Sequence, residues 1–214
     1  MRFTLCGSPH SLPTYKVALM LRVAGQPFSF RHVSFQKGMH KTPEFLALSR
    51  WGQVPVLADH GRIHLQSAAI VEHLAGTLDR FQGADVATRQ MVREWLYWDV
   101  DVLSPPVFGC YGVQLGERKL LPISVEPAIA DYHRRRAEAA ATILDTHLSQ
   151  RAYLCGAEPT IADIFCYGDV AFAEICSFEL GRWPHIVGWA QKIKSLPGFK
   201  APFELLAMQD AELV

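Results

Sequence analysis

The stretch Trp51–Leu57 constrains the fold most strongly, because it places a proline at the entrance of an apolar run. Proline donates no backbone hydrogen bond, so it is found at the start of a strand or at a bend rather than inside a central strand. Pro55 therefore predicts a turn that leads into a strand. The bond between Val54 and Pro55 is also of the kind that most often adopts the cis form.

Two conformations of this bond stay open at this point. A cis bond would turn the amide and carbonyl of Val54 away from the sheet, where an extended peptide ligand can pair with them as an added strand. An ordinary trans proline that opens an edge strand needs no ligand. Trans is the commoner form of an X-Pro bond, so the spacing alone favours it.

Gln66 and Ser67 close the next short run, Arg62–Leu65, and open an apolar-periodic segment, Ala68–Leu78. The pattern predicts a strand followed by a helix, with Ser67 as the N-cap. A helix N-terminus with free N–H groups and a hydroxyl is also suited to a carboxylate. This segment alone fits a cap without a ligand equally well.

The N-terminal third alternates strands and helices. Arg2–Gly7 and Phe28–Ser34 are typical of strands, and Tyr15–Arg22 between them is typical of a helix that ends near Gly25. Pro13 suits a first helical turn, which makes Ser11 the expected N-cap. A short helix that starts at Thr42-Pro43-Glu44, two antiparallel strands and the helix after Ser67 complete a β-α-β-α-β-β-α order. The expected fold class is therefore α/β and thioredoxin-like.

The pattern breaks at residues 80–84, and everything after this linker is predicted to be helical. We therefore expect one domain over residues 1–79 and an all-helical domain over residues 85–214. Val86–Leu103 has helical spacing and is followed by two prolines that end or kink the helix. Glu126–Leu148 has an apolar stripe that predicts a long helix against a core. Thr160 and Asp163 have the spacing of a capping box.

Composition excludes several classes of protein. Among the 214 residues, lysine plus arginine and aspartate plus glutamate number 21 each, so no electrostatic field indicates a nucleic acid or a membrane surface as partner. No apolar run reaches the ~18 residues of a membrane span. Five cysteines without a C-x-x-C pair, and histidines without ligand spacing, predict neither disulfides nor a metal. We expect a cytoplasmic protein.

Three segments in order carry a resemblance to a known family: residues 38–48, Gly52–Leu57 and Gln66–Ile70. They resemble the glutathione-binding half of the cytosolic glutathione S-transferases, and are closest to the serine-type phi-like and bacterial classes. The resemblance spans most of residues 2–78. Thr160–Asp163 and Trp183–Trp189 are similar to the later helical domain of that family. The resemblance implies a homodimer, with Trp51 as a possible interface residue; from the sequence, a Trp51 buried in the core is an equal alternative.

The resemblance implies that Ser11 is the catalytic residue. It would donate a hydrogen bond to the thiolate of glutathione at the positive end of a helix, and so lower a thiol pKa that is ordinarily ~8.5. Ser8 lies nearer the strand and is the alternative. As a plain N-cap, Ser11 would need no ligand.

The same resemblance implies two further sets of site residues. Those expected to bind glutathione are His40, Lys41, Gln53, Val54, Pro55, Gln66 and Ser67. Those expected to line a pocket for a hydrophobic substrate, in the cleft between the domains, are Leu12, Phe35, Val107, Phe108 and Tyr111. Two departures stand out: Gln66 replaces the family's usual glutamate, and Ser49-Arg50-Trp51 replaces its usual Asn-Pro.

Three functions are compared on this basis. The first is a glutathione S-transferase that conjugates glutathione, its co-substrate, to small hydrophobic electrophiles, as in detoxification. The alternative is a glutathione-binding or scaffold protein that keeps the fold without the chemistry, which the loss of charge at Gln66 favours slightly. A glutathione-dependent reductase or peroxidase would be favoured by a cysteine at position 11. The serine found there argues against this third function.

Overall fold

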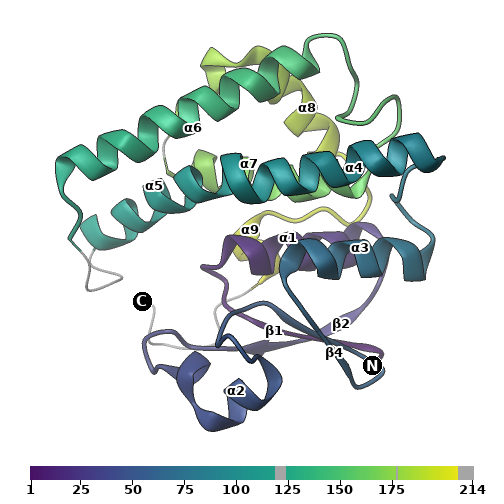
Figure 1. Ribbon diagram of the computed structural model, residues 1–214, viewed down its shortest axis with the longest axis vertical. Coiled ribbons are helices and arrows are strands. Elements are labelled where there is room, and N and C mark those ends of the chain that lie inside the picture. The colour runs from purple at the N-terminus through teal and green to yellow at the C-terminus, as the bar shows by residue number, and fades with distance from the viewer. Residues whose placement is uncertain (119–123, 177, 207–214) are drawn as a thin grey trace. The chain divides into compact units, whose positions relative to one another are not determined.

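The computed structural model describes residues 1–118, 124–176 and 178–206 (Figure 1). The chain forms two compact units. The first contains Met1–Arg80 together with the described residues from Pro197 onward, and the second contains Phe81–Leu196. The domain limits 1–79 and 85–214 stay a prediction, and the packing differs from them in placing residues 197–206 with the first unit.

The first unit is built on a four-stranded mixed sheet with the strand order β2-β1-β3-β4. Strands β1 and β2 are parallel, and the other two pairings are antiparallel. The strands are β1 (Phe3–Gly7), β2 (Phe28–His32), β3 (Val56–Asp59) and β4 (Arg62–Leu65). The helices are α1 (Leu12–Val23), α2 (Pro43–Leu48), α3 (Ser67–Leu78) and the short C-terminal α9 (Pro202–Leu205). This arrangement confirms the predicted thioredoxin-like fold.

Helices cover both faces of the sheet. Side chains alternate between the two faces along each strand, so each face has its own set of buried residues. Helices α1 and α3 lie together on one face of the sheet, and α2 lies beyond the other (Figure 1). Phe45 of α2 packs with Cys6 and Val56 of the central strands. Successive side chains of a strand point to opposite faces, so the fully buried Leu5 and Leu57 point away from α2. Cys6 is thus a buried apolar residue, as its position in the strand indicates.

The C-terminal segment closes on the start of this unit. The Tyr15 hydroxyl donates a hydrogen bond to the carbonyl of Lys200 at 2.9 Å. The His10 ring lies 5.4 Å from the ring of Phe203, measured between centroids. Gly198 has φ +83°, and a Cβ added there would lie 2.6 Å from the Arg22 carbonyl oxygen. These contacts join two ends of the sequence, and no local pattern predicts them.

The second unit is helical. Its main helices are α4 (Val86–Trp98), α5 (Ser104–Glu117), α6 (Pro127–Leu148), α7 (Ile161–Ile175) and α8 (Pro184–Lys194). A π-helical segment, Asp99–Leu103, joins α4 to α5, so helical structure continues past Pro105 and Pro106. Both prolines lie in the first turn of α5, where proline is tolerated. Within the described residues, no helix is long and apolar enough to cross a membrane.

Asp163 organises the core of the helical unit. Its carboxylate accepts hydrogen bonds from the Leu154 amide, the Thr160 amide, the Thr160 hydroxyl and the Trp189 indole N–H, at 2.8 to 3.0 Å. The residue is fully buried, and burial raises the pKa of Asp163 while these four bonds oppose the rise. The capping box predicted from Thr160 and Asp163 is confirmed.

Candidate functional site

Ser11 lies in the turn that connects β1 to α1. It is the N-cap of α1, with extended backbone angles, and its hydroxyl oxygen accepts a hydrogen bond from the Thr14 amide at 3.2 Å. Only 5% of the residue is exposed. The first turn of α1 lies tightly on the strand, because a Cβ added to Gly7 would come within 2.3 Å of the Thr14 side chain. Glycine at the end of β1 therefore fixes where the N-terminus of α1 points.

Ser8 lies in the same turn as Ser11. Its carbonyl accepts a hydrogen bond from the Ser11 amide at 3.0 Å, and its hydroxyl oxygen accepts one from the His10 amide at 3.3 Å. Ser8 is also buried. Burial lowers the pKa of His10, and the nearby His32 lowers it further. The turn thus presents two buried hydroxyls, and the choice of Ser11 over Ser8 stays a prediction.

The turn before Pro55 is held together by Ser49. The Ser49 hydroxyl donates to the Gln53 carbonyl at 2.8 Å and accepts from the Gln53 amide at 3.2 Å. Gly52 has φ +60°, and an added Cβ would lie 2.8 Å from the His40 carbonyl oxygen. From the sequence, Ser49 is only part of the Ser49-Arg50-Trp51 departure and has no predicted role in the turn, although its position four residues before Gln53 and its small hydroxyl side chain are the signal.

The Val54–Pro55 peptide bond is cis, the less common of the two forms considered. Val54 comes directly before β3 and enters none of the ladder pairs that join β3 to β1 and β4. Pro55 is buried and Val54 is half-buried.

Gln66 rather than Ser67 is the N-cap of α3, which corrects the predicted cap. The helix begins at Ser67 because the backbone turns sharply at Gln66, with φ +68° and ψ +116°. Such angles cost a non-glycine residue about 1–3 kcal/mol and are concentrated at functional sites. The Gln66 amide group donates a hydrogen bond to the Gln53 side-chain oxygen at 3.3 Å, so these two predicted site residues do meet.

His40 and Lys41 form a 3-10 turn, Met39–Lys41, beside the Ser49–Gln53 turn. The Lys41 ammonium nitrogen lies 3.5 Å from the position of a Cβ on Gly52. The His40 ring meets the Phe35 ring edge-on, with 5.1 Å between centroids. Burial lowers the pKa of His40, and the positive charge of Lys41 lowers it further. The structure therefore brings the expected glutathione-binding loops of the first unit together.

The residues expected to bind a hydrophobic substrate have different environments. Leu12, Val107 and Tyr111 are buried, whereas Phe35 and Phe108 are 38% and 57% exposed. Leu12 and Phe35 belong to the first unit and the others to α5 of the second. Their union in one pocket stays a prediction.

Trp51 is 45% exposed, so the alternative of a tryptophan buried in the core is wrong. The Arg50 guanidinium lies 4.1 Å above its ring. Trp51, Ile63 and Gln66 line part of a cavity of about 540 Å³ in the first unit. Among the described residues, no group of three or more histidine, cysteine, aspartate or glutamate side chains could hold a metal ion.

Comparisons with known proteins bear on both units. Residues 5–79 match the family model "Glutathione S-transferase, N-terminal domain", and residues 118–192 match "Glutathione S-transferase, C-terminal domain". The chain is 29% identical to glutathione S-transferase theta-2 of Homo sapiens over 197 residues, which cover 88% of this chain and 79% of the relative. It is 29% identical to glutathione S-transferase 3 of Zea mays over 210 residues, covering 92% of this chain and 90% of the relative.

A solved structure agrees with these matches. The fold is similar to that of the glutathione S-transferase from Pseudomonas fluorescens Pf-5, with a TM-score of 0.82 and 27% identity over 94% of this chain and 99% of that one. The two family models match the chain in the order in which the two units follow each other. The chain therefore belongs to the glutathione S-transferase family.

Proposed function

We propose that this protein transfers the thiolate of glutathione to small hydrophobic electrophiles, and that Ser11 stabilises the thiolate. The observation that carries the proposal is the buried Ser11 hydroxyl at the N-terminus of α1. Its oxygen already accepts the Thr14 amide, so the hydroxyl proton can be donated to an anion in front of the helix. Relatives named glutathione S-transferases support the reaction class.

The chemistry follows from the pKa of a thiol. A free thiol has a pKa of ~8.5, so only a small fraction is thiolate at neutral pH, and the thiolate is the form that attacks. A hydroxyl donor and the positive end of a helix both favour the anion and so lower the pKa of the thiol. The thiol proton goes to solvent, the sulfur forms a bond to carbon, and with an aryl halide the halide ion leaves.

The rest of the first unit offers groups for the peptide. We propose that the backbone of Val54 pairs with the tripeptide and that the N-terminal turn of α3, beginning at Ser67, binds its γ-glutamyl carboxylate through free N–H groups. Lys41 and His40 would bind the glycyl carboxylate. Gln53 and Gln66 contact each other and would bind the γ-glutamyl end through neutral amides.

The test compares three variants in turnover of an aryl halide with glutathione. Ser11→Ala is expected to lower kcat/KM by about 10²–10³, as the loss of one hydrogen-bond donor to a reacting anion does. The same change removes an N-cap worth about 1 kcal/mol, so Asp85→Ala serves as the control. Asp85 caps α4 by accepting the Thr88 amide at 2.7 Å, and its loss should cost similar stability without affecting turnover. Full activity in Ser11→Ala together with its loss in Ser8→Ala would assign the role to Ser8.

The alternative is a protein that binds glutathione or serves as a scaffold without turning over an electrophile. Gln66 favours it, because a neutral amide bonded to Gln53 stands where a carboxylate would pair with the ligand's ammonium group. Retention on immobilised glutathione without turnover of several aryl halides would support this alternative. If the protein shows no retention on glutathione and no turnover, both proposed functions are wrong. We also propose a homodimer, which light scattering tests directly.

A further inference from the structure

A cavity of about 630 Å³ lies in the helical unit, and none of the residues assigned a glutathione or substrate role above lines it. Its walls come from α5, α6 and the residues on either side of the 3-10 turn Leu180–Arg182. The volume is in the range of sites that hold small molecules. Four carboxylates and two guanidinium groups line it.

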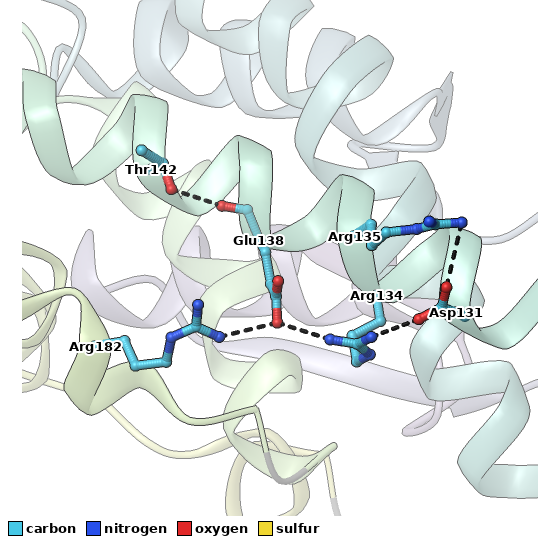
Figure 2. A network of polar contacts seen from close by, with 6 residues as sticks. All are labelled: Asp131, Arg134, Arg135, Glu138, Thr142 and Arg182. Carbon is cyan, nitrogen blue, oxygen red and sulfur yellow. Dashed lines mark hydrogen bonds and ion pairs between the residues drawn. The ribbon is translucent and has the colours of Figure 1, made fainter.

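Glu138 joins the two guanidinium groups. One oxygen of its carboxylate accepts hydrogen bonds from Arg134 at 3.1 Å and from Arg182 at 3.0 Å, as Figure 2 shows. Arg134 also pairs with Asp131. Each guanidinium carries five N–H donors, and these contacts use only one or two of them. The two arginines therefore lie close together with donors still available for a ligand carboxylate.

The Arg182 guanidinium contacts Trp183, which forms an aromatic pair with Phe178. Its guanidinium lies 4.9 Å from the centre of the Trp183 ring, and that ring is stacked on Phe178 at 5.2 Å with 10° between the planes. The Trp183 indole N–H donates to the Thr142 hydroxyl of α6 at 3.1 Å. The Arg182 side chain is 56% exposed, so these contacts orient its guanidinium and leave it accessible to a ligand.

Gln114 of α5 also lines the cavity. The side-chain nitrogen of Gln114 donates to the Ile175 carbonyl at 2.9 Å, whereas its buried side-chain oxygen has no hydrogen-bond partner among the described residues. That oxygen has no surface open to solvent, so it lies behind the cavity wall and out of reach of a ligand. Glu117 and Glu179 line the same cavity, and among the described residues neither takes part in the ion pairs of Arg134 and Arg182.

The numbers of carboxylates and guanidinium groups in the cavity indicate which class of ligand it can bind. A dianion would meet two more carboxylates than guanidinium groups, and a simple cation would leave the donors of Arg134 and Arg182 unused. We propose that the cavity binds a zwitterion of the amino-acid or short-peptide class, with a carboxylate on the two arginines and ammonium groups toward the carboxylates of Glu117 and Glu179. This site does not depend on the proposed transferase function.

Isothermal titration calorimetry of the full chain with the dipeptide lysyl-glycine tests the proposal. Its matched probes are lysyl-glycinamide, which lacks the carboxylate, and inorganic phosphate, which lacks the amines. We expect saturable binding of the dipeptide and at least ~10-fold weaker binding of both probes, since a hydrogen bond to a charged group is worth about 1.5–3 kcal/mol. Equal binding of either probe, or no saturable binding of the dipeptide at millimolar concentration, would overturn the assignment.

Variants locate the site. Arg182→Gln should weaken dipeptide binding by about 10-fold or more, and Glu179→Gln by several-fold. Arg135→Gln is the matched control, because Arg135 pairs with Asp131 on the same helix but does not line the cavity, so binding should be unchanged. Melting temperatures confirm that each variant is folded. Equal losses in Arg135→Gln and Arg182→Gln, or displacement of the dipeptide by saturating S-methylglutathione, would reject this site.

Discussion

Gln66 combines a left-handed backbone conformation with a neutral side chain at the start of α3. The backbone angles depend on the surrounding turn, so a side chain of the same size can replace it without moving the helix. Gln66→Glu should therefore keep the backbone geometry and place a carboxylate where we propose that the α-ammonium group of glutathione lies. It removes the donor to the Gln53 oxygen, but the Gln53 amide can turn and donate to the new carboxylate instead. An exposed ion pair is worth about 0.2–1 kcal/mol, so KM for glutathione should fall by up to about 5-fold.

The salt dependence separates this effect from a change of shape. Exposed charges are strongly screened when the Debye length falls to ~3 Å at 1 M salt, so the gain of Gln66→Glu should largely disappear there. Steady-state kinetics at low and high ionic strength make the measurement. An unchanged KM at low salt would place the ammonium group of the peptide elsewhere.

At the scale of the elements, Asp59 ties three of them together. It ends β3, and its carboxylate accepts two hydrogen bonds from Arg2, just before β1, at 2.7 and 3.0 Å. It also contacts His73 of α3 at 3.0 Å, and His60 lies 3.9 Å away. Hydrogen bonding by Arg2, with a smaller contribution from His73, holds the pKa of Asp59 well below its ordinary value.

A lowered carboxyl pKa contributes stability that is present above the unfolded pKa of ~3.9 and is lost as the pH falls toward the folded pKa. Asp59→Asn should lower the free energy of unfolding at pH 7 by about 2–3 kcal/mol, because hydrogen bonds to a charged group are lost while the Arg2 charge stays. It should also flatten the decline of stability below pH 4. Urea denaturation over a pH series measures both effects, with the exposed Asp101→Asn as control. Equal acid profiles for Asp59→Asn and wild type would contradict this account.

Helix starts were predictable where a side chain dictates them. Ser11 before Pro13 and the Thr160–Asp163 pair identify their helices, because the cap is a local hydrogen bond between neighbours in sequence. The start of α3 was misplaced by one residue, since a positive φ at Gln66 depends on the tertiary turn and not on the residue type. The α4–α5 junction continues as a π-helical segment for a similar reason: prolines are tolerated in a first helical turn as well as after a helix.

At the scale of the whole molecule, the order of elements along the sequence does not reveal to which unit the C-terminal residues belong. The fold class followed from the strand and helix periodicities, but residues after Pro197 show no pattern that assigns them to the first unit. Their placement rests on single contacts between distant positions, such as the Tyr15 hydroxyl with Lys200. The cavity at Arg134 and Arg182 was missed for the same reason, because its walls come from segments that are unrelated in sequence.

Gly198 is the position where this return of the chain can be tested. Its φ of +83° disfavours any side chain, and an added Cβ would lie 2.6 Å from the backbone oxygen of Arg22, which cannot move without disturbing the end of α1. Gly198→Ala should therefore lower the free energy of unfolding by about 2–4 kcal/mol, from backbone strain and steric overlap together. Gly188→Ala is the matched control, because Gly188 lies inside α8 with nothing within 4 Å of an added Cβ, and alanine should be neutral or stabilising by about 0.5–1 kcal/mol. Chemical denaturation gives the free energies, and amide hydrogen exchange should show that the loss of protection in Gly198→Ala begins in α1. Equal stability of the two variants would mean that the C-terminal segment does not hold the first unit in the way its contacts indicate.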